Sequence, residues 1–348
     1  MDDFVAPLRL RLEEDALLAN WRWLAKRSGG AACGAAIKAN GYGLGAREVM
    51  LRLARAGCRD FFVSNWAEAA ALAPFLTDDL SLSVLHGVRA EDMARALASR
   101  ARPVLSTPTQ IARWKAAGGG ACDIMVDTGM NRLGLDWRAE ASALVEGLAI
   151  DTLMSHLASA DEDGPLSGVQ RARFSDLCPS ISAGRYSLAN SAGICLGSDY
   201  AFDLTRPGLA LYGAAPRREA IGHIRQVVFP QVQVLQRRRV PAGESIGYNA
   251  TYRATADMEV AVLNLGYADG YLRGFSDRGS VRADDAVLPV VGRVSMDLIA
   301  IDVSVRPTIA EGDWLTMDYA LGEAARVSGL SQYELLTGLG ARFDRIWH

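Results

Sequence analysis

Two kinds of hydrophobic pattern alternate along the first two thirds of the chain. Stretches such as AREVMLRLARAG and WAEAAALAPFL place apolar residues at helical spacing. Between them stand short apolar runs that end in polar residues or glycine. The eight runs read CGAAIK, DFFVSN, LSVLHG, RPVLST, CDIMVD, DTLMSH, RYSLAN and FDLTRP. Regular alternation of strand and helix predicts a parallel sheet, and eight repeats predict an α/β fold, the (β/α)8 barrel of TIM type.

The pattern changes after Gly213. Runs rich in Val and Ile, such as PQVQVLQRRRV and AVLPVVGRVSMDLIAIDV, are broken by Pro, Gly and Asp, and a helical pattern returns only around Gln332 to Leu336. The early segment LRLRL alternates apolar and basic residues, which predicts a strand. We therefore expect a barrel over residues 11–224, followed by a mostly β domain over 225–348 that also takes in an N-terminal strand, 1–10.

Composition and charge narrow the class of protein without naming a chemistry. The chain has 348 residues and a formal net charge of -3, which suits two globular domains and offers no case for a nucleic-acid surface. The arginines at 217–218 and 237–239 are interpreted as solvated faces. No two of the four histidines stand at metal-ligand spacing, so we expect no metal site.

Cysteine usage and the first residues bear on location. The five cysteines are dispersed and form no C-x-x-C pair, which indicates free thiols in a reducing compartment. The segment MDDFVAPLRLRLEED has no apolar stretch of signal-peptide length, and no segment has the length needed to span a bilayer. We therefore expect a cytoplasmic protein.

Candidate chemistry gathers at the ends of the eight runs, because barrel active sites lie at the C-terminal ends of the strands. The runs deliver Lys38, Asn65, His86, Ser106, Asp127, His156, Asn190 and Arg206. A lysine that closes a buried strand is costly unless its amine is neutralised or used. With a lowered pKa, such an amine forms imines readily.

The glycines after Lys38 allow a second interpretation. Residues 41–46, GYGLGA, match the dinucleotide fingerprint G-x-G-x-x-G/A, and Asp60 lies near the expected distance downstream. A ribose-binding acid should end the second strand, however, whereas Asp60 precedes that run and Asn65 ends it. The dehydrogenase interpretation is therefore disfavoured.

The segment AAIKANGYGLGA resembles the lysine motif of alanine racemases, a pyridoxal-phosphate-dependent family with a barrel followed by a β domain. Further blocks resemble that family in the same order along nearly the whole chain. They are DTGMNRLG, SHLASADE, LANSAG, LTRPGLALYG, SIGYNATY, LGYADGY and GRVSMDLIAIDV. The resemblance implies an isomerase that interconverts L- and D-alanine without a metal.

The resemblance also implies which residues contact the cofactor: Lys38, Tyr42, His156, Asn190, Ser191, Arg206, Gly208, Leu209 and Tyr333. Lys38 would hold the cofactor and act as one base. His156 would pack against the ring and orient Arg206 by a hydrogen bond, and Arg206 would face the pyridine nitrogen. Because a guanidinium keeps its proton, that nitrogen should stay unprotonated, which weakens the ring as an electron sink and favours racemisation over transamination.

The substrate side follows from the same resemblance. Tyr248 would be the second catalytic base, supplied by the partner subunit and activated by His156. Met296, also from the partner, would lie near the substrate carboxylate, and Tyr267 would line the entry. Arg132 would face that carboxylate. A homodimer with shared active sites is implied.

The sequence departs from the family pattern at two places. Where the family commonly has a lysine carrying a carbamate that holds the carboxylate-binding arginine, this chain has Met125. Arg132 must then be positioned otherwise, by Asn131, by Asp127 or by a bound anion. The segment 342–345 reads RFDR, where the family often has R-V-P-R, so the entry can differ. A broader or serine-type racemase, a decarboxylase of the same architecture and a non-catalytic pyridoxal-phosphate-binding protein stay open as alternatives.

Overall fold

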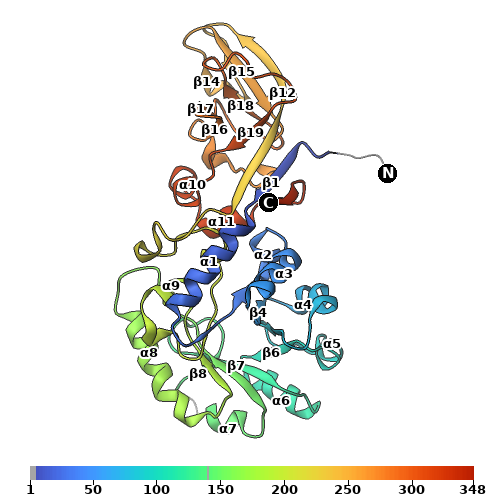
Figure 1. Cartoon of the computed structure of the whole chain (residues 1–348), viewed down its shortest axis with the longest axis vertical. Coiled ribbons are helices and arrows are strands. Elements are labelled where there is room, and N and C mark those ends of the chain that lie inside the picture. Colours follow the sequence, from blue (N-terminus) through green and yellow to red (C-terminus); the bar gives the residue numbers. More distant parts are fainter. Residues whose placement is uncertain (1–4, 139–140) are drawn as a thin grey trace. The chain divides into compact units, whose positions relative to one another are not determined.

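A computed structural model describes residues 5–138 and 141–348 of the chain. The chain divides into two compact units (Figure 1). The first, which we call the barrel unit, consists of Leu17–Leu211 and Ala215–Arg225. The second, the β unit, consists of Met1–Ala16, Tyr212–Ala214 and Gln226–His348. The predicted fold class, a barrel followed by a mostly β domain, is confirmed.

The barrel unit contains a parallel sheet in which each predicted run supplies one strand, except the first run, which supplies two. The strands are β2 (Ala32–Cys33) with β3 (Ala35–Ala36), β4 (Asp60–Val63), β5 (Ser81–Val84), β6 (Arg102–Leu105), β7 (Cys122–Asp127), β9 (Ile150–Met154), β10 (Arg185–Ser187) and β11 (Leu204–Thr205). Seven of them pair in the order β10-β9-β7-β6-β5-β4-β3, β11 pairs with β2, and β8 (Leu135–Asp136) pairs with β7. The N–H of Ala32 donates to the carbonyl of Asp203 at 2.9 Å, and the N–H of Asp203 donates to the carbonyl of Tyr186 at 3.0 Å. β11 thus joins the two ends of the sheet.

Helices connect the strands, and Figure 1 shows α3 to α6 on the outer side of the sheet. The helices are α1 (Glu14–Arg27), α2 (Lys38–Tyr42), α3 (Ala46–Ala56), α4 (Trp66–Leu72), α5 (Met93–Leu97), α6 (Pro108–Ala116), α7 (Ala141–Val145), α8 (Leu166–Leu177) and α9 (Ser191–Cys195). Polar residues at run ends start several of them. The side chain of Asn65 accepts from the N–H groups of Ala67 and Glu68, both at 3.0 Å, and thereby caps α4.

Ionic side chains at the beginnings of the strands form a network inside the barrel unit. Arg102 contacts Asp151 at 2.8 Å and Asp123 at 3.4 Å, and Arg185 contacts Asp60 at 2.8 Å and Asp151 at 2.9 Å. Asp123 is fully buried, and its carboxylate also accepts from the hydroxyl of Ser83 at 2.6 Å. Burial raises the pKa of Asp123 to about 6, although Arg102 opposes the shift.

The β unit is built around one long strand, β12 (Val228–Val240). The other strands are β1 (Leu8–Leu12), β13 (Ser245–Ile246), β14 (Tyr252–Arg253), β15 (Met258–Leu263), β16 (Ser280–Ala283), β17 (Ala286–Pro289), β18 (Ile299–Asp302), β19 (Trp314–Met317) and β20 (Asp344–Trp347). The LRLRL segment forms β1, which pairs antiparallel with β12 and parallel with β20. Residues 1–4 of the predicted strand 1–10 lie outside the described residues.

Two helices complete the β unit, α10 (Leu321–Ser328) and α11 (Gln332–Thr337). The sequence predicted only the second, so the expectation that helix returns only around Gln332 was wrong. α10 is amphipathic, with its buried residues Leu321 and Ala324 one turn apart, but its eight residues are shorter than the window over which helical periodicity is assessed.

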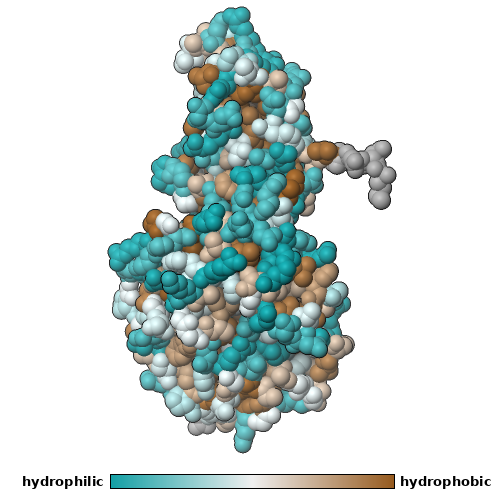
Figure 2. All heavy atoms as spheres, in the orientation of Figure 1, coloured by the Kyte–Doolittle hydropathy of each residue, from teal (hydrophilic) through white to brown (hydrophobic). Residues whose placement is uncertain are grey.

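The surface seen in Figure 2 is largely hydrophilic, with hydrophobic residues in small separate groups. In residues 5–138 and 141–348 we find no helix with the length and apolar character required to cross a membrane. The same residues contain no cluster of three or more His, Cys, Asp or Glu side chains able to hold a metal ion.

Candidate active site

Lys38 lies two residues after the end of β3, at the C-terminal end of a barrel strand, and begins an unusual turn. The φ angles of Ala39, Asn40, Gly41 and Tyr42 are 52°, 54°, 63° and 53°. Four consecutive residues therefore adopt the left-handed conformation, which costs each non-glycine residue about 1–2 kcal/mol. The N–H of Gly41 donates to the carbonyl of Ile37 at 2.8 Å, which fastens the turn to the end of the strand. Strain of this kind persists only where the surroundings hold it.

Glu68 of α4 provides part of that support. Its carboxylate accepts from the N–H of Ala39 at 2.8 Å and from the N–H of Ser64 at 2.7 Å. Burial lowers the pKa of the Lys38 amine, Arg132 lowers it further, and Glu68 partly opposes the shift. Glu68 was not singled out from the sequence, where it is one acid among several in the first turns of helices.

The loop after β7 carries Arg132, whose side chain is exposed. The carboxylate of Asp127 accepts from the N–H groups of Gly129 at 2.8 Å, Met130 at 2.9 Å and Arg132 at 2.9 Å. Burial opposes ionisation of Asp127, but these hydrogen bonds outweigh it and lower its pKa. Of the three groups considered for positioning Arg132, Asp127 is thus seen to hold the backbone of that residue.

Met125 contributes to the same loop by packing. A β-carbon placed on Gly134 would lie 3.2 Å from Cγ of Met125 and 2.6 Å from the backbone nitrogen of Asp127. The buried Met125 side chain therefore fills the space beside the loop, at the position where the family commonly has its modified lysine.

Arg206 is a buried cation at the end of β11. Its guanidinium donates to the hydroxyl of Ser187 and, at 2.6 Å, to the carbonyl of Ser155. Burial lowers the pKa of Arg206 to about 10, with Asp123 opposing the shift, so the group stays charged at neutral pH. The expectation that His156 orients this arginine by a hydrogen bond was wrong, because Ser155 and Ser187 are the partners.

His156 is half-buried. It lies close enough to the charged site residues for their charges to shift its pKa. Burial lowers its pKa to about 3, and the positive charges of Arg206, Arg132 and Lys38 act in the same direction. The imidazole is therefore neutral over the physiological range. These electrostatic couplings show that the barrel unit brings the four residues together.

A second group of predicted residues meets where Tyr42 approaches β11. The hydroxyl oxygen of Ser191 accepts from the N–H groups of Gly208 at 2.9 Å and Ala210 at 3.2 Å. A β-carbon on Gly208 would lie 2.3 Å from the hydroxyl oxygen of Tyr42, so any larger residue would have to displace the Tyr42 ring. Asn190 has a different task, since its side chain accepts from the N–H of Gly193 at 2.9 Å and caps α9.

Leu209 begins the short helix Leu209–Tyr212, and its N–H group needs no partner within that helix. Together with the hydroxyl groups of Ser191 and Tyr42 it supplies donors within a small region of the barrel unit, next to the Gly208 N–H, which donates to Ser191. Donors of this kind suit an anionic group such as a phosphate.

The remaining predicted residues belong to the β unit. Tyr248 is 68% exposed and Met296 is 53% exposed. The N–H groups of Tyr267 and Ala268 donate to the carbonyls of Ser295 and Met296, both at 3.0 Å, so two of the predicted blocks lie side by side. A β-carbon on Gly247 would lie 3.5 Å from the backbone nitrogen of Arg293. Tyr248 therefore follows a residue that packs against the segment carrying Met296.

Tyr333 lies on α11 of the β unit and is 47% exposed. The C-cap of this helix, Gly338, packs against the block that carries Tyr267, because a β-carbon on Gly270 would lie 2.2 Å from the carbonyl oxygen of Gly338. The helix itself starts with a reciprocal cap, in which Ser331 and Glu334 bond to each other's backbone N–H groups.

Arg342, from the RFDR segment, fastens two of these blocks. Its guanidinium donates to the carboxylate of Asp269 at 2.6 Å and to that of Asp297 at 2.8 Å. The buried Asp269 also accepts from the N–H of Gly266 at 2.9 Å. Sequence reasoning did not find this pairing, because the partners are more than forty residues apart along the chain.

The environment of Arg217 also differs from the one predicted. It was interpreted as part of a solvated face, but it is buried. Its guanidinium donates to the carbonyls of Ala160 at 2.8 Å and Glu162 at 2.9 Å, and pairs with Asp163 at 2.5 Å. Arg217 thus holds the loop that follows His156.

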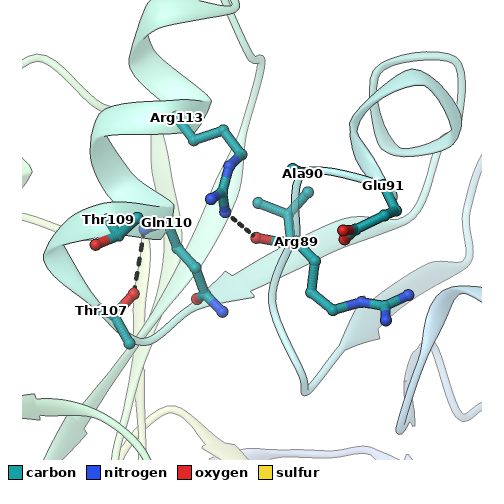
Figure 3. Close-up of a pocket in the computed structure, with 8 residues that line it drawn as sticks. Arg89, Ala90, Glu91, Thr107, Thr109, Gln110 and Arg113 are labelled. Carbon is teal, nitrogen blue, oxygen red and sulfur yellow. Dashed lines mark hydrogen bonds between the residues drawn. The ribbon is translucent and has the colours of Figure 1, made fainter.

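A cavity of about 340 Å³ lies elsewhere on the barrel unit, beyond the ends of β5 and β6 (Figure 3). It is lined by Val88, Arg89, Ala90, Glu91, Thr107, Thr109, Gln110 and Arg113. The guanidinium of Arg113 donates to the carbonyl of Val88 at 2.9 Å, and the hydroxyl of Thr107 accepts from the N–H of Gln110 at 3.1 Å. None of the predicted site residues lines this cavity.

Fold and site together define a barrel enzyme whose candidate site is built around a lysine amine of lowered pKa. Residues 12–216 match the model of the alanine racemase N-terminal domain, and residues 227–347 match that of the C-terminal domain. The chain is 39% identical to the alanine racemase of Acidiphilium cryptum, over 97% of this chain and 98% of the relative. It is 42% identical to that of Rhodospirillum rubrum, over 97% and 94%.

A solved structure gives the same result. The alanine racemase of Bartonella henselae with covalently bound pyridoxal phosphate matches with a TM-score of 0.92 and 32% identity, covering 99% of this chain and all of that chain. The chain belongs to the alanine racemase family, whose enzymes are pyridoxal-phosphate-dependent isomerases.

The residues present fit this cofactor. The Lys38 amine has a lowered pKa, as imine formation requires. Gly208 has no side chain to keep the Tyr42 hydroxyl away from its backbone, and its N–H donates to the Ser191 hydroxyl oxygen, so two hydroxyl groups lie close together at this point. Arg206 offers a buried cation with only neutral hydrogen-bond partners.

Proposed function

We propose that this protein interconverts L- and D-alanine with pyridoxal phosphate bound through Lys38, by a two-base mechanism. The observation that carries the proposal is the placing of the half-buried Lys38 amine, with a lowered pKa, among Arg132, His156 and Arg206. Membership of the alanine racemase family supports it. When bound, the cofactor makes the α-hydrogen of the amino acid acidic enough to be removed.

The chain's own residues would divide the remaining work. The Nζ atom of Lys38 would take or return the proton on one face of the α-carbon, and the hydroxyl of Tyr248 would do so on the other. Arg132 would bind the substrate carboxylate through its exposed guanidinium. Arg206 would face the ring nitrogen and, being charged at neutral pH, would not accept a proton from it.

A neutral His156 suits its proposed part in this scheme. Because its pKa is lowered to about 3, the imidazole has a lone pair free to accept a hydrogen bond at neutral pH. It could therefore accept from the Tyr248 hydroxyl and increase the basicity of the phenol oxygen.

We further propose that the active site is shared between two subunits of a homodimer. Tyr248 and Met296 are exposed on the β unit, where a second copy of the chain could take them up. The five cysteines are free thiols, in keeping with a cytoplasmic enzyme that supplies D-alanine.

Subunit mixing tests both proposals. Circular dichroism of alanine over time measures racemisation. The variants Lys38→Ala and Tyr248→Phe should each show little or no racemisation. Mixed dimers of the two variants should regain activity, because one of their two sites combines an intact Lys38 with an intact Tyr248 from the other subunit. If the mixture stays inactive although mixed dimers form, the shared site is wrong. If Tyr248→Phe alone racemises normally in both directions, the two-base assignment is wrong.

A further inference from the structure

The side-chain amide of Gln170, on α8, is fully buried and joins two loops of the barrel unit. Its nitrogen donates to the carbonyl of His156 at 2.9 Å and to the hydroxyl of Thr128 at 3.4 Å. Its oxygen accepts from the N–H of Ala158 at 2.9 Å. One side chain therefore contacts both the loop after β7 and the loop after β9.

The contacts of Gln170 continue to three predicted site residues. Thr128 shares a hydrogen bond of 2.8 Å with the hydroxyl of Ser155, whose carbonyl accepts from Arg206. Thr128 also follows Asp127, which holds the backbone of Arg132. Through at most two intermediate groups, Gln170 is linked to His156, Arg206 and Arg132.

An amide is the side chain that these partners require. The Ala158 N–H needs an acceptor, whereas the His156 carbonyl needs a donor, and one terminal amide supplies both. A carboxylate in its place could not donate, and an apolar side chain would leave buried groups unpaired at both loops. The buried location excludes water as a ready substitute.

We propose that Gln170 is a positioning residue that holds Arg132 and His156 in one fixed arrangement. The same buried amide then fixes both the position of Arg132, which would bind the substrate carboxylate, and that of His156, which would contact the cofactor ring. This inference rests on the proposed function, because it assigns to Gln170 the alignment of the two halves of that site.

Arg173, one turn along α8, provides a matched control. Its guanidinium donates to the carbonyl of Thr128 at 2.9 Å, and a β-carbon on Gly129 would lie 2.9 Å from the same guanidinium. The hydrogen bonds of Arg173 therefore reach the loop after β7 and not the loop after β9.

Hydrogen exchange of the pyridoxal-phosphate-loaded enzyme tests the inference. Gln170→Met keeps the length of the side chain but removes its hydrogen bonds. It should raise exchange by about tenfold or more in both segments 127–134 and 156–162. Arg173→Met should raise exchange in segment 127–134 alone. Unchanged exchange in either segment of Gln170→Met, or an equal rise throughout the barrel, would overturn the inference.

Kinetics and spectra give a second test, which also serves if Gln170→Met fails to fold. Thr128→Val removes one hydroxyl and with it the bonds to Gln170 and Ser155. This variant should show two changes at once: a higher KM for alanine and an altered visible circular dichroism of the bound cofactor. A change in only one of these two quantities would contradict the shared positioning.

The two proposals fail in different ways. If the unmodified enzyme does not racemise alanine, the proposed function fails, whatever the exchange data show. If it does racemise alanine but Gln170→Met leaves both loops and KM unchanged, the positioning role alone fails.

Discussion

The hydroxyl of Tyr42 lies against the α-carbon of Gly208. A β-carbon at that position would stand 2.3 Å from the hydroxyl oxygen and 2.9 Å from Cζ of the ring. The contact joins the left-handed turn after Lys38 to the segment after β11, where hydroxyl and N–H donors suited to an anionic group lie close together. It exists because one of the two residues has no side chain.

Gly208→Ala should therefore displace the Tyr42 ring and weaken pyridoxal-phosphate binding by about tenfold or more, measured by titrating the cofactor-free protein. In a Tyr42→Phe background, Gly208→Ala should weaken cofactor binding less, because the hydroxyl oxygen that lies closest to the new β-carbon is absent. Equal losses of affinity in the two backgrounds would show that the contact with Tyr42 is not the cause.

The left-handed turn makes opposite predictions for two neighbouring positions. Ala39→Gly should stabilise the cofactor-free protein by up to about 1 kcal/mol, because glycine adopts φ of 52° without strain. Gly41→Ala should destabilise it by more than about 1 kcal/mol, since φ is 63° and the new β-carbon would lie 3.0 Å from the nitrogen of Ala46. Urea unfolding measures both changes, and effects of the same sign would contradict this account.

Two buried tyrosines of the β unit should respond differently to loss of their hydroxyl. That of Tyr271 has no hydrogen-bond partner among the described residues, whereas that of Tyr319 donates to the carbonyl of Leu335 at 3.0 Å. Tyr271→Phe should raise the free energy of unfolding by about 1 kcal/mol, and Tyr319→Phe should lower it by about as much. Thermal unfolding of the two variants side by side checks the contrast. A destabilised Tyr271→Phe would mean that this hydroxyl has a partner, such as a buried water.

The raised pKa of Asp123 predicts a pH-dependent stability. The folded protein holds this proton up to about pH 6, whereas an unfolded aspartate releases it near about 3.9. The contribution of Asp123 to folding is thus complete below about pH 4 and is lost as the pH rises through about 6. The loss amounts to about 3 kcal/mol.

Asp123→Asn should remove that dependence. Between about pH 4 and pH 7 the free energy of unfolding of the variant should rise relative to the unmodified protein by about 2–3 kcal/mol. Asp151→Asn is the control with the opposite sign, since burial raises the pKa of Asp151 but its bonds to Arg185 and Arg102 lower it overall. The contribution of Asp151 is lost only below the unfolded value of about 3.9, so urea unfolding from about pH 2 to pH 7 is needed to measure both. Parallel stability profiles for the unmodified protein and Asp123→Asn would contradict the raised pKa.

Much of the barrel could be predicted because its signals are local. Each apolar run is a few residues long and ends in the residue that the strand delivers, so Lys38 and Arg206 could be placed at strand ends without knowing their neighbours. Motif resemblance supplied the residues of the β unit, such as Tyr248, which no periodicity distinguishes.

The side-chain partners could not be predicted, because they come from distant parts of the sequence. Arg206 bonds to Ser155 and Ser187 rather than to His156, and small serines at strand ends carry no pattern of their own. Gln170 and Arg217 looked like ordinary residues of a helix and a basic surface. Their roles depend on which backbone groups the fold leaves to be satisfied.

The methionine beside the Arg132 loop has a consequence for how the enzyme depends on its surroundings. A carbamate forms only by uptake of dissolved carbon dioxide and is lost when that gas is removed. Here the apolar side chain of Met125 fills the space by Gly134, and a carboxylate encoded in the sequence, that of Asp127, holds the loop. Degassed, bicarbonate-free buffer should leave this enzyme as active as before.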